Sequence, residues 1–368
     1  MHFQCTKADL VQSIALVERA VSTTDTMQVI KGIHLRVTDN NVVLTTTNLE
    51  LSIRTQAPCH VMQPGSLVLD GKLFAAIVRK LPDETVVIQK KENSDQVEIT
   101  AGTAEFSIHS LTGEDFPEFP AKEQDELITI PANTLHTFIK NTVFATSQDE
   151  TRPYLGGVYI ELDPTTLRFT ATDSNRLSTY MMELEAEHTA EITAIVPGKT
   201  MTEVHRSLPQ DKKLKVSLHK AKNQLVFTFD HTIIASRLID GQFPNYRSVI
   251  PGEQPITITT NKNNLQAAVD RVSLLDPKGV QPIVLEVTDG VLEVKTPSSD
   301  MGFACEQLNV EHTGQNGRAA FSPKYILDML RACESEQITL EYNSDLRQAV
   351  LRPAEGRHHI YVLMPVRI

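Results

Sequence analysis

The segment ADLVQSI at Ala8–Ile14 recurs twice along the chain, as ANTLHTFI at Ala132–Ile139 and as KNNLQAAV at Lys262–Val269. Each copy is followed by a second segment in which the apolar residues have helical spacing. These second segments are GKLFAAIVRKLP from Gly71, GKTMTEVHRSLP from Gly198 and PKYILDMLRACE from Pro323. The repeat interval of about 125 to 130 residues is the size of one globular domain. The sequence of 368 residues therefore predicts three related domains in tandem.

Antiparallel strands are predicted between the helical segments of each domain. Ile33, Leu35 and Val37 alternate with polar residues before the turn at Asp39–Asn41, and this is the spacing of a half-buried strand. The second domain repeats the pattern at Val158–Leu162. The predicted fold class is therefore α+β, with helices on one face of antiparallel sheets. Acidic, proline-bearing segments in which neither spacing persists set the predicted domain boundaries at 1–121, 122–250 and 251–368.

The helical segments are predicted to bury one face and to present cations on the other. In the segment that begins at Gly71, a period of about 3.6 residues defines two stripes. The apolar stripe comprises Leu73, Phe74, Ile77, Val78 and Leu81, and the opposite stripe comprises Lys72, Ala75, Ala76, Arg79 and Lys80. One such helix is most often only a solvated amphipathic helix. Its repetition in a fixed frame favours a shared functional surface.

The charge of the chain is unevenly distributed. A net charge of −11 argues against a nucleic-acid partner, because phosphate binding depends on Lys and Arg. The repeated helical segments nevertheless carry a positive charge in sum, so the acidic excess lies on the strands and loops. The chain is basic only in selected places.

Targeting and cysteine signals are weak in this sequence. The start MHFQCTKADL has no basic segment followed by an apolar run, and no stretch approaches the roughly 18 apolar residues of a membrane span. A cytoplasmic location is therefore expected. Cys5, Cys59, Cys305 and Cys333 are scattered without a CxxC pair, which predicts reduced structural thiols.

Common catalytic motifs are not found in the sequence, which lacks GxGxxG, GxxxxGK[ST], HExxH and GxSxG. The adjacent His358 and His359 resemble a ligand pair at first sight. Neighbouring residues of a strand point to opposite faces, however, so the two side chains could not chelate one ion together. The sequence therefore predicts no catalytic residue, no metal site and no cofactor. It predicts a protein that holds other molecules.

Three segments resemble the bacterial sliding-clamp family, the β subunits of DNA polymerase III. They are FTATDSNRL at Phe169–Leu177, SRLIDGQFPNYRSVIP at Ser236–Pro251 and YVLMPVRI at Tyr361–Ile368. They occur together at the spacing of that family and within a threefold repeat, so the resemblance extends over essentially the entire chain. It implies three DNA-clamp domains, a head-to-tail homodimeric ring with the helices inside, and double-stranded DNA encircled without sequence preference.

The size of the implied ring suits duplex DNA. Two chains would supply twelve helices, and helices about 10 Å wide would form a circle roughly 38 Å across at their axes. Subtracting one helix width leaves a channel of about 28 Å, which is wider than B-form DNA. A ring retains DNA by topology and needs only weak phosphate contacts. The acidic net charge is then compatible with a DNA partner.

The resemblance also implies a pocket for short peptides from the replicative polymerase, the clamp loader and other clamp-motif proteins. Leu, Val, Met and Pro side chains would form an apolar concavity, and the polar residues around it would fix a peptide backbone. The matching residues are Leu155, Thr172, Ser174, Asn175, Arg176, Leu177, Pro244, Val249, Val362, Met364, Pro365, Val366 and Arg367. The plainer alternative is that these are core residues of a domain boundary.

DNA-facing and dimer-interface residues are implied in the same way. The DNA-facing residues are Lys72, Arg79, Lys80, Lys140, Arg152, Tyr154, Lys199, Arg206, Lys262, Lys324 and Arg331. The interface residues are Phe106 and Ile108 of one chain, which would meet Leu274 and Leu275 of the other.

The chain departs from the family pattern at four places, one of which is the loop Arg152–Leu155, where only Arg152 and Tyr154 of the pattern are retained. The family usually reads D-G-H-R-L where this chain has the residues Asp173–Leu177 with Ser174 and Asn175 inside, which predicts an altered pocket rim. The loop Ser22–Gln28 carries no cation, so DNA contact from this loop is not expected. Thr103 and Glu105 stand where cations are common, which predicts a ring that opens more easily or uses other ion pairs.

The leading functional hypothesis is a sliding clamp that tethers the replicative polymerase for processive synthesis and has no catalytic activity of its own. One alternative is a three-domain scaffold that binds peptides without encircling DNA. Another is an enzyme whose site is too dispersed to recognise in the sequence. Ring closure around DNA separates the first two hypotheses.

Overall fold

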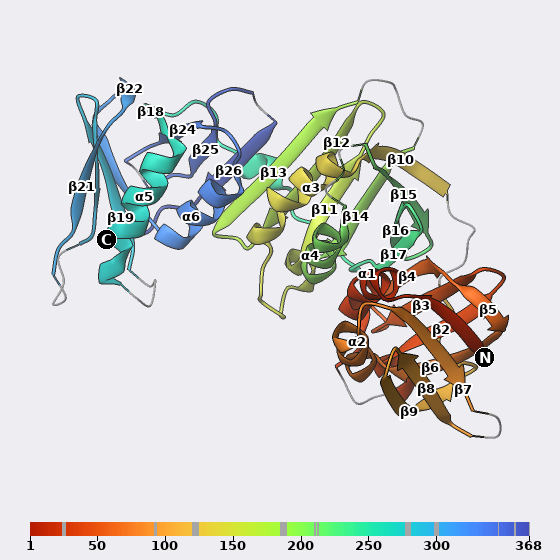
Figure 1. Ribbon diagram of the computed structural model, residues 1–368. Coiled ribbons are helices and arrows are strands. Elements are labelled where there is room, and N and C mark those ends of the chain that lie inside the picture. Colours follow the sequence, from red (N-terminus) through yellow and green to blue (C-terminus); the bar gives the residue numbers. More distant parts are fainter. Residues whose placement is uncertain are drawn as a thin grey trace. The chain divides into compact units, whose positions relative to one another are not determined.

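The structure is a computed structural model, shown in Figure 1. It describes residues 1–23, 27–91, 94–119, 125–184, 190–209, 211, 213–276, 281–297, 302–344, 346–356 and 358–367. The chain divides into two compact units. The first unit is formed by Met1–Leu135 with Glu203–Leu238, and the second by His136–Thr202 with Ile239–Ile368.

The segments that recur in the sequence form the α-helices. They are α1 (Lys7–Val17), α2 (Gly71–Lys80), α3 (Ala132–Lys140), α4 (Gly198–Ser207), α5 (Lys262–Val272) and α6 (Pro323–Ala332). A short polar residue begins several of them by accepting a hydrogen bond from an otherwise unpaired amide. Asp70 Oδ1 accepts from the Leu73 amide at 2.8 Å, and Asn261 Oδ1 accepts from the Asn263 amide at 2.9 Å. The predicted helix starts are thus explained by local capping.

The first unit contains a 13-stranded antiparallel sheet in the order β10-β15-β16-β17-β4-β3-β2-β6-β9-β8-β7-β1-β5. Its strands are β1 (His2–Thr6), β2 (Gly32–Thr38), β3 (Asn41–Thr47), β4 (Leu51–Pro58), β5 (His60–Gln63), β6 (Gly65–Asp70), β7 (Thr85–Lys90), β8 (Gln96–Ala101), β9 (Ala104–Thr112), β10 (Asp125–Pro131), β15 (Lys215–Ala221), β16 (Gln224–Phe229) and β17 (Thr232–Arg237).

The second unit contains a 9-stranded sheet, β14-β11-β12-β13-β26-β25-β24-β18-β22, and a 4-stranded sheet, β21-β20-β19-β23. The strands are β11 (Gly157–Leu162), β12 (Thr166–Thr172), β13 (Arg176–Glu183), β14 (Ile192–Pro197), β18 (Ile256–Asn261), β19 (Ile283–Thr288), β20 (Val291–Lys295), β21 (Cys305–Asn309), β22 (Glu311–Gly314), β23 (Gly317–Phe321), β24 (Gln337–Tyr342), β25 (Ala349–Pro353) and β26 (His359–Leu363).

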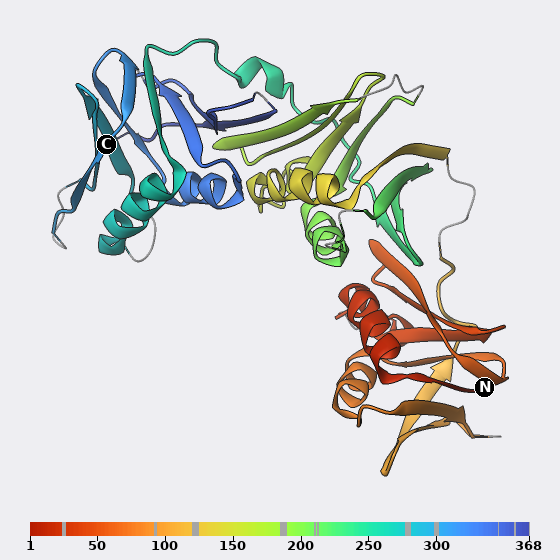
Figure 2. The same ribbon diagram turned by 45° about the horizontal axis from the view of Figure 1, so that its top comes forward.

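Two helices cover one face of these strands in the second unit. Figure 2 shows α5 and α6 side by side against the sheets. Leu265 and Val269 of α5 and Leu330 of α6 are fully buried in one apolar cluster with Phe321 and Leu340 of the strands. Helices on one face of antiparallel sheets are the α+β arrangement that the sequence predicts.

The predicted face of α2 is wrong at two positions. Leu73, which the sequence places on the buried stripe, is 48% exposed, and Ala75, which it places on the opposite stripe, is 1% exposed. The buried arc of α2 is centred between Phe74 and Val78. At about 100° per residue Ala75 falls just inside this arc and Leu73 just outside it. The prediction gave the size of the apolar side chains too much weight and therefore placed the centre of the buried stripe wrongly.

One type of strand joint occurs twice in the chain. The strands β4-β3-β2-β6, β13-β12-β11-β14 and β21-β20-β19-β23 have the same order in the three repeats. At the first joint, β4 pairs with β17, and at the second joint β13 pairs with β26. Successive repeats are thus connected by continuous sheets as well as by the chain itself.

Candidate binding site in the second unit

A cavity of about 240 Å³ opens beside the joint of β13 and β26. Its floor is apolar, since Leu155, Leu177 and Val362 belong to one buried cluster with Tyr246. The predicted pocket residues that line it are Leu155, Thr172, Ser174, Arg176, Leu177, Pro244, Val249, Val362 and Met364. The structure therefore brings residues from distant parts of the sequence to one apolar concavity.

Four predicted pocket residues do not line this cavity: Asn175, Pro365, Val366 and Arg367. They lie close to it along the chain. The carbonyl of Asn175 accepts a 2.9 Å hydrogen bond from the Met364 amide, and the Val366 amide donates to the Ala320 carbonyl at 2.8 Å. The C-terminal segment is thus held by the β12–β13 turn at one point and by β23 at another.

Sequence reasoning missed three lining residues, Asn245, Tyr246 and Gln348. The first two lie in the segment that carries the family resemblance and directly follow Pro244, so their position gave a usable signal. Gln348 immediately precedes β25 and reaches the cavity only because β25 pairs with β26. The local sequence does not indicate that Gln348 reaches the cavity.

A tight turn between β12 and β13 forms one rim of the cavity. Asp173 Oδ1 accepts hydrogen bonds from the amides of Asn175 at 2.9 Å and Arg176 at 3.0 Å. Ser174 has a φ of +79°, which is a left-handed conformation that favours glycine. Its Oγ accepts a 2.8 Å hydrogen bond from Arg152 Nη1. Arg152, predicted to face DNA, is thus bonded to the rim of this cavity.

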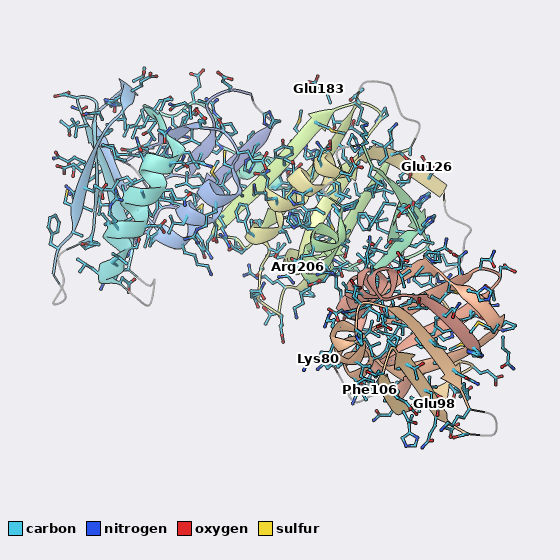
Figure 3. The ribbon with its side chains drawn as sticks, in the orientation of Figure 1. Lys80, Glu98, Phe106, Glu126, Glu183 and Arg206 are labelled. Atoms are coloured by element: carbon cyan, nitrogen blue, oxygen red, sulfur yellow. The ribbon has the colours of Figure 1, made fainter. Side chains whose placement is uncertain are left out.

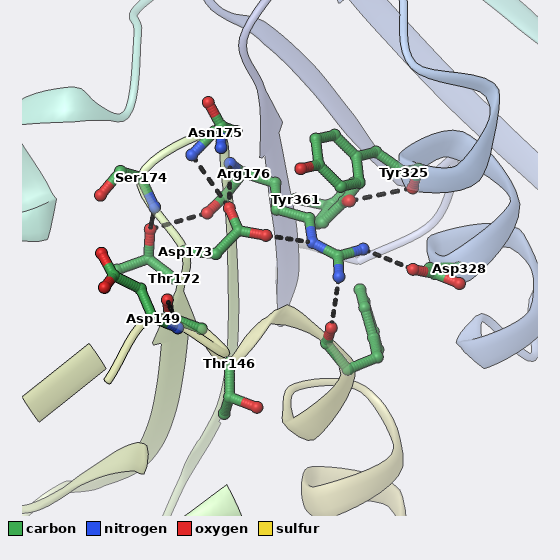
Figure 4. A network of polar contacts seen from close by, with 12 residues as sticks. Thr146, Asp149, Thr172, Asp173, Ser174, Asn175, Arg176, Tyr325, Asp328 and Tyr361 are labelled. Atoms are coloured by element: carbon green, nitrogen blue, oxygen red, sulfur yellow. Dashed lines mark hydrogen bonds and ion pairs between the residues drawn. The ribbon is translucent and has the colours of Figure 1, made fainter. Parts of the chain in front are cut away.

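Arg176 connects three elements beneath the cavity (Figure 4). Its side chain is 6% exposed, and Nε donates to Asp173 at 3.0 Å while Nη1 donates to Asp328 of α6 at 2.5 Å. Nη2 donates to the carbonyl of Phe144 at 2.6 Å, and the guanidinium lies 4.5 Å from the centroid of the Tyr325 ring. A buried cation with its donors satisfied on several sides is a fixed structural element.

A buried histidine lies at the same strand joint. His359 is 1% exposed, and its Nε2 is 3.0 Å from Ser178 Oγ, which in turn donates to the Asn141 carbonyl. Burial, and secondarily the neighbouring His358, lowers the pKa of His359 to about 3.

Within the described ranges no cluster of three or more His, Cys, Asp or Glu side chains could hold a metal ion. None of the helices in the described part of the chain is long and apolar enough to cross a membrane.

Many of the cations predicted to face DNA have carboxylate partners. The pairs are Arg79 with Glu18, Lys140 with Glu334, Arg152 with Asp149, Arg206 with Glu203 and Arg331 with Asp270. Lys262 donates to the Cys333 carbonyl at 3.0 Å, and Tyr154 is half-buried. Lys72, Lys80, Lys199 and Lys324 are exposed. Among the residues that the structure describes, these four lysines form no ion pair.

The predicted interface residues lie on two separate elements. Phe106 and Ile108 are on β9, where Phe106 is 38% exposed and lies at the surface (Figure 3). Leu274 and Leu275 lie on a 3-10 helix, Ser273–Leu275, that follows α5, and Leu274 is 77% exposed. The two elements belong to different units of the chain.

Part of the loop Ser22–Gln28, residues 24–26, lies outside the described residues.

Three domains built alike from antiparallel sheets and helices have the architecture of DNA clamps. Family models of the DNA polymerase III beta subunit match the chain with the N-terminal domain at residues 1–120, the central domain at 129–245 and the C-terminal domain at 247–367. The chain therefore belongs to the family of DNA polymerase III beta subunits, the beta sliding clamps. The boundaries at 121/122 and 250/251 stay predictions.

Individual relatives agree over the full length of the chain. The beta sliding clamp of Bacillus subtilis (strain 168) is 32% identical, with 100% of both chains covered. A crystal structure of the Bacillus subtilis sliding clamp has a TM-score of 0.95 at 31% identity and covers 100% of this chain and 99% of that one. The Pseudomonas aeruginosa sliding clamp bound to griselimycin has a TM-score of 0.94 at 26% identity, with 100% of both chains covered.

Proposed function

We propose that this chain forms a head-to-tail homodimeric ring around double-stranded DNA and tethers the replicative polymerase through the cavity beside β13 and β26. Membership of the sliding-clamp family supports the DNA and polymerase parts of this proposal. An apolar concavity of about 240 Å³ with polar groups on its rim supports the tethering role, because it could accept apolar anchor side chains of a peptide. Peptides of the clamp loader and other clamp-motif proteins would use the same cavity.

The observation that carries the ring is the repeated strand joint. β4 and β13 are equivalent strands, and each pairs with a strand of the next repeat. β21 is the third equivalent strand, and it is the end strand of its sheet. β9 is the first-repeat counterpart of β17 and β26, and it pairs with β6 only through Ser110–Thr112. The free edge of β9 in one copy therefore suits β21 of another.

Strand register predicts which residues would face each other between two copies. At the first joint Ile233 pairs with Arg54. Glu105 has the place on β9, counted from the β8–β9 turn, that Ile233 has on β17. Cys305 of β21 lies opposite Lys295 as Arg54 lies opposite Thr45, and Lys295 and Thr45 are equally far from the turns that precede their strands. Opposite residues of an antiparallel pair lie within about 4.5 to 5.5 Å at their Cα atoms, which is within the range of a disulfide.

A crosslink tests this proposal. Glu105→Cys should form a disulfide with Cys305 of a second copy when diamide, which accepts the two electrons and two protons of the thiols, is added after loading on circular DNA. Two such bonds would close the ring covalently. The dimer should then stay on the circular DNA in denaturant and come off only after the DNA is cut. Thr103→Cys, outside the predicted register, is the control. Only monomeric protein after oxidation would refute the ring.

The DNA part of the function would depend on weak contacts. Topology retains the duplex in a closed ring, so a few exposed lysines suffice and sliding is unhindered. No step of this function requires a catalytic group or a cofactor. We infer that the chain is not itself an enzyme and that it acts in the cytoplasm, where the replicative polymerase would meet it.

One observation favours the alternative of a peptide-binding scaffold that does not encircle DNA. Five of the predicted DNA-facing cations are paired with carboxylates, namely Arg79, Lys140, Arg152, Arg206 and Arg331. The loading experiment separates the two functions, because a scaffold would bind peptides yet give no product that is topologically held on circular DNA.

A further inference from the structure

We propose that Glu161 is a positioning residue for the candidate peptide site, because it fixes one wall of the cavity through the hydroxyl of Tyr246. Glu161 lies on β11 and does not line the cavity. The wall consists of Pro244, Asn245, Tyr246 and Val249. This inference rests on the peptide-binding role proposed above.

The wall has little backbone support of its own. It lies between β17 and β18, outside any strand, and contains only the short 3-10 helix Tyr246–Val249. Among the residues that the structure describes, and apart from contacts within that helix, the wall makes one backbone hydrogen bond, from the Tyr246 amide to the Pro244 carbonyl at 2.7 Å. A segment without a sheet ladder is positioned chiefly by its side chains.

Side chains attach the wall to the outward-facing side of β11. The Tyr246 hydroxyl donates to Glu161 Oε2 at 2.5 Å, and Arg247 Nη2 donates to Glu161 Oε1 at 2.9 Å. The Phe243 ring stacks on Tyr159 with centroids 4.7 Å apart. Tyr159 and Glu161 are two residues apart on one strand and therefore share a face. Both carboxylate oxygens of Glu161 are used to hold the wall.

Burial makes the hydroxyl contact the stronger part of this attachment. Tyr246 is 3% exposed and the Glu161 side chain is 13% exposed, whereas the Arg247 side chain is 60% exposed. Burial, followed by the hydrogen bond to Glu161, raises the pKa of Tyr246 to about 12. The hydroxyl therefore stays protonated and donates at physiological pH. A hydrogen bond to a charged acceptor away from water stabilises more than an exposed ion pair.

The first repeat provides an internal comparison. Its linker also stacks an aromatic ring on the strand, since Phe116 lies 4.9 Å from the ring of His34, the counterpart of Tyr159. The counterpart of Glu161 is Arg36, however, and the counterpart of Tyr246 is Phe119, which has no hydroxyl. The aromatic stack is thus common to both linkers, while the carboxylate anchor belongs to the linker that forms the cavity wall.

The test compares four variants of the full-length protein. The probe is a synthetic peptide that carries Gln and paired Leu and Phe anchors, titrated by calorimetry. Tyr246→Phe and Glu161→Ala should each weaken binding about three- to tenfold, which corresponds to one hydrogen bond of typical net strength. The double variant should lose no more than the stronger single one, because both changes remove the same contact. Glu161→Gln retains an acceptor for the hydroxyl but not its charge, and should lose less affinity than Glu161→Ala does.

Hydrogen exchange separates positioning from general destabilisation. Both disruptive variants should speed exchange of the amides in 243–249 and leave β11 and β12 protected. Glu183→Ala, an exposed carboxylate on β13 in the same unit, is the matched control and should change neither readout. If Tyr246→Phe binds the peptide as tightly as the wild-type protein does, the role of Glu161 is overturned and the peptide site is not. Failure of the wild-type protein to bind the peptide would overturn the peptide site itself, and this role with it.

Discussion

Single residues at the joint of β13 and β26 link the stability of the second unit to pH. His359 has its pKa lowered to about 3 by burial, whereas an unfolded histidine titrates near 6.5. The folded chain therefore binds fewer protons than the unfolded chain between these values. Stability is unaffected above about pH 6.5 and is lost progressively as the pH falls toward 3.

We expect His359 to cost the second unit about 2 kcal/mol of unfolding free energy between pH 7.5 and pH 5. Urea denaturation of the full chain at the two pH values measures this loss. His359→Gln keeps a polar group next to Ser178 but cannot be protonated, so its loss should be smaller by roughly that amount. Equal losses in the two proteins would mean that other groups cause the acid sensitivity.

The residues of the candidate site were predictable to different degrees. Leu155, Leu177 and Val362 line the cavity as the resemblance implies, although their role in binding stays a prediction. The anchor Glu161 was not predictable, because a carboxylate on an alternating strand has the sequence signature of a solvated residue. Its role depends on Tyr246, which is 85 positions away along the chain.

At the scale of elements, the helices were the most predictable part of the fold. Their repeated starts and their apolar spacing are local properties, and capping residues such as Asp70 and Asn261 fix where they begin. The strand partners were not predictable from spacing. Pairing of β13 with β26 joins segments far apart in the sequence, and the register depends on both edges at once.

The corrected face of α2 leads to a prediction at the same scale. Ala75→Leu should lower the unfolding free energy by about 1 to 3 kcal/mol, because a larger side chain must enter a filled interior. Leu73→Glu should change it by no more than about 0.5 kcal/mol, since Leu73 is 48% exposed. Urea denaturation, monitored by circular dichroism, compares the unfolding free energies of the two variants. The opposite ranking would restore the face that the sequence predicted.

At the scale of the whole molecule, the proposed ring would explain how a chain with a net charge of −11 can act on DNA. The family membership and the threefold repeat were both accessible from the sequence. The sequence did not show which cations remain available to contact DNA, because ion pairs such as that of Arg79 with Glu18 join separate elements.

Retention on DNA should depend most on the lysines without ion pairs. Lys72→Glu combined with Lys80→Glu should shorten the lifetime on circular DNA and weaken its dependence on salt, since two phosphate-attracting charges become repulsive and fewer counterions are released. Arg79→Glu alone is the control on the same helix and should have a smaller effect, because Glu18 already neutralises Arg79. Filter retention of labelled circles across a salt series measures both. A larger effect of Arg79→Glu would show that its pairing does not persist near DNA.

The repeated strand joint has a consequence for where such a ring would open. If the joint between copies uses the same edge pairing as the two joints within a chain, all three have similar intrinsic strength. The joints within a chain, however, are tethered by the chain itself, so their strands meet at a high effective concentration. The joint between copies has no tether and depends on the protein concentration in the cell. Dilution, or a partner that separates one edge pair, would therefore open the ring at a joint between copies and leave the joints within each chain closed.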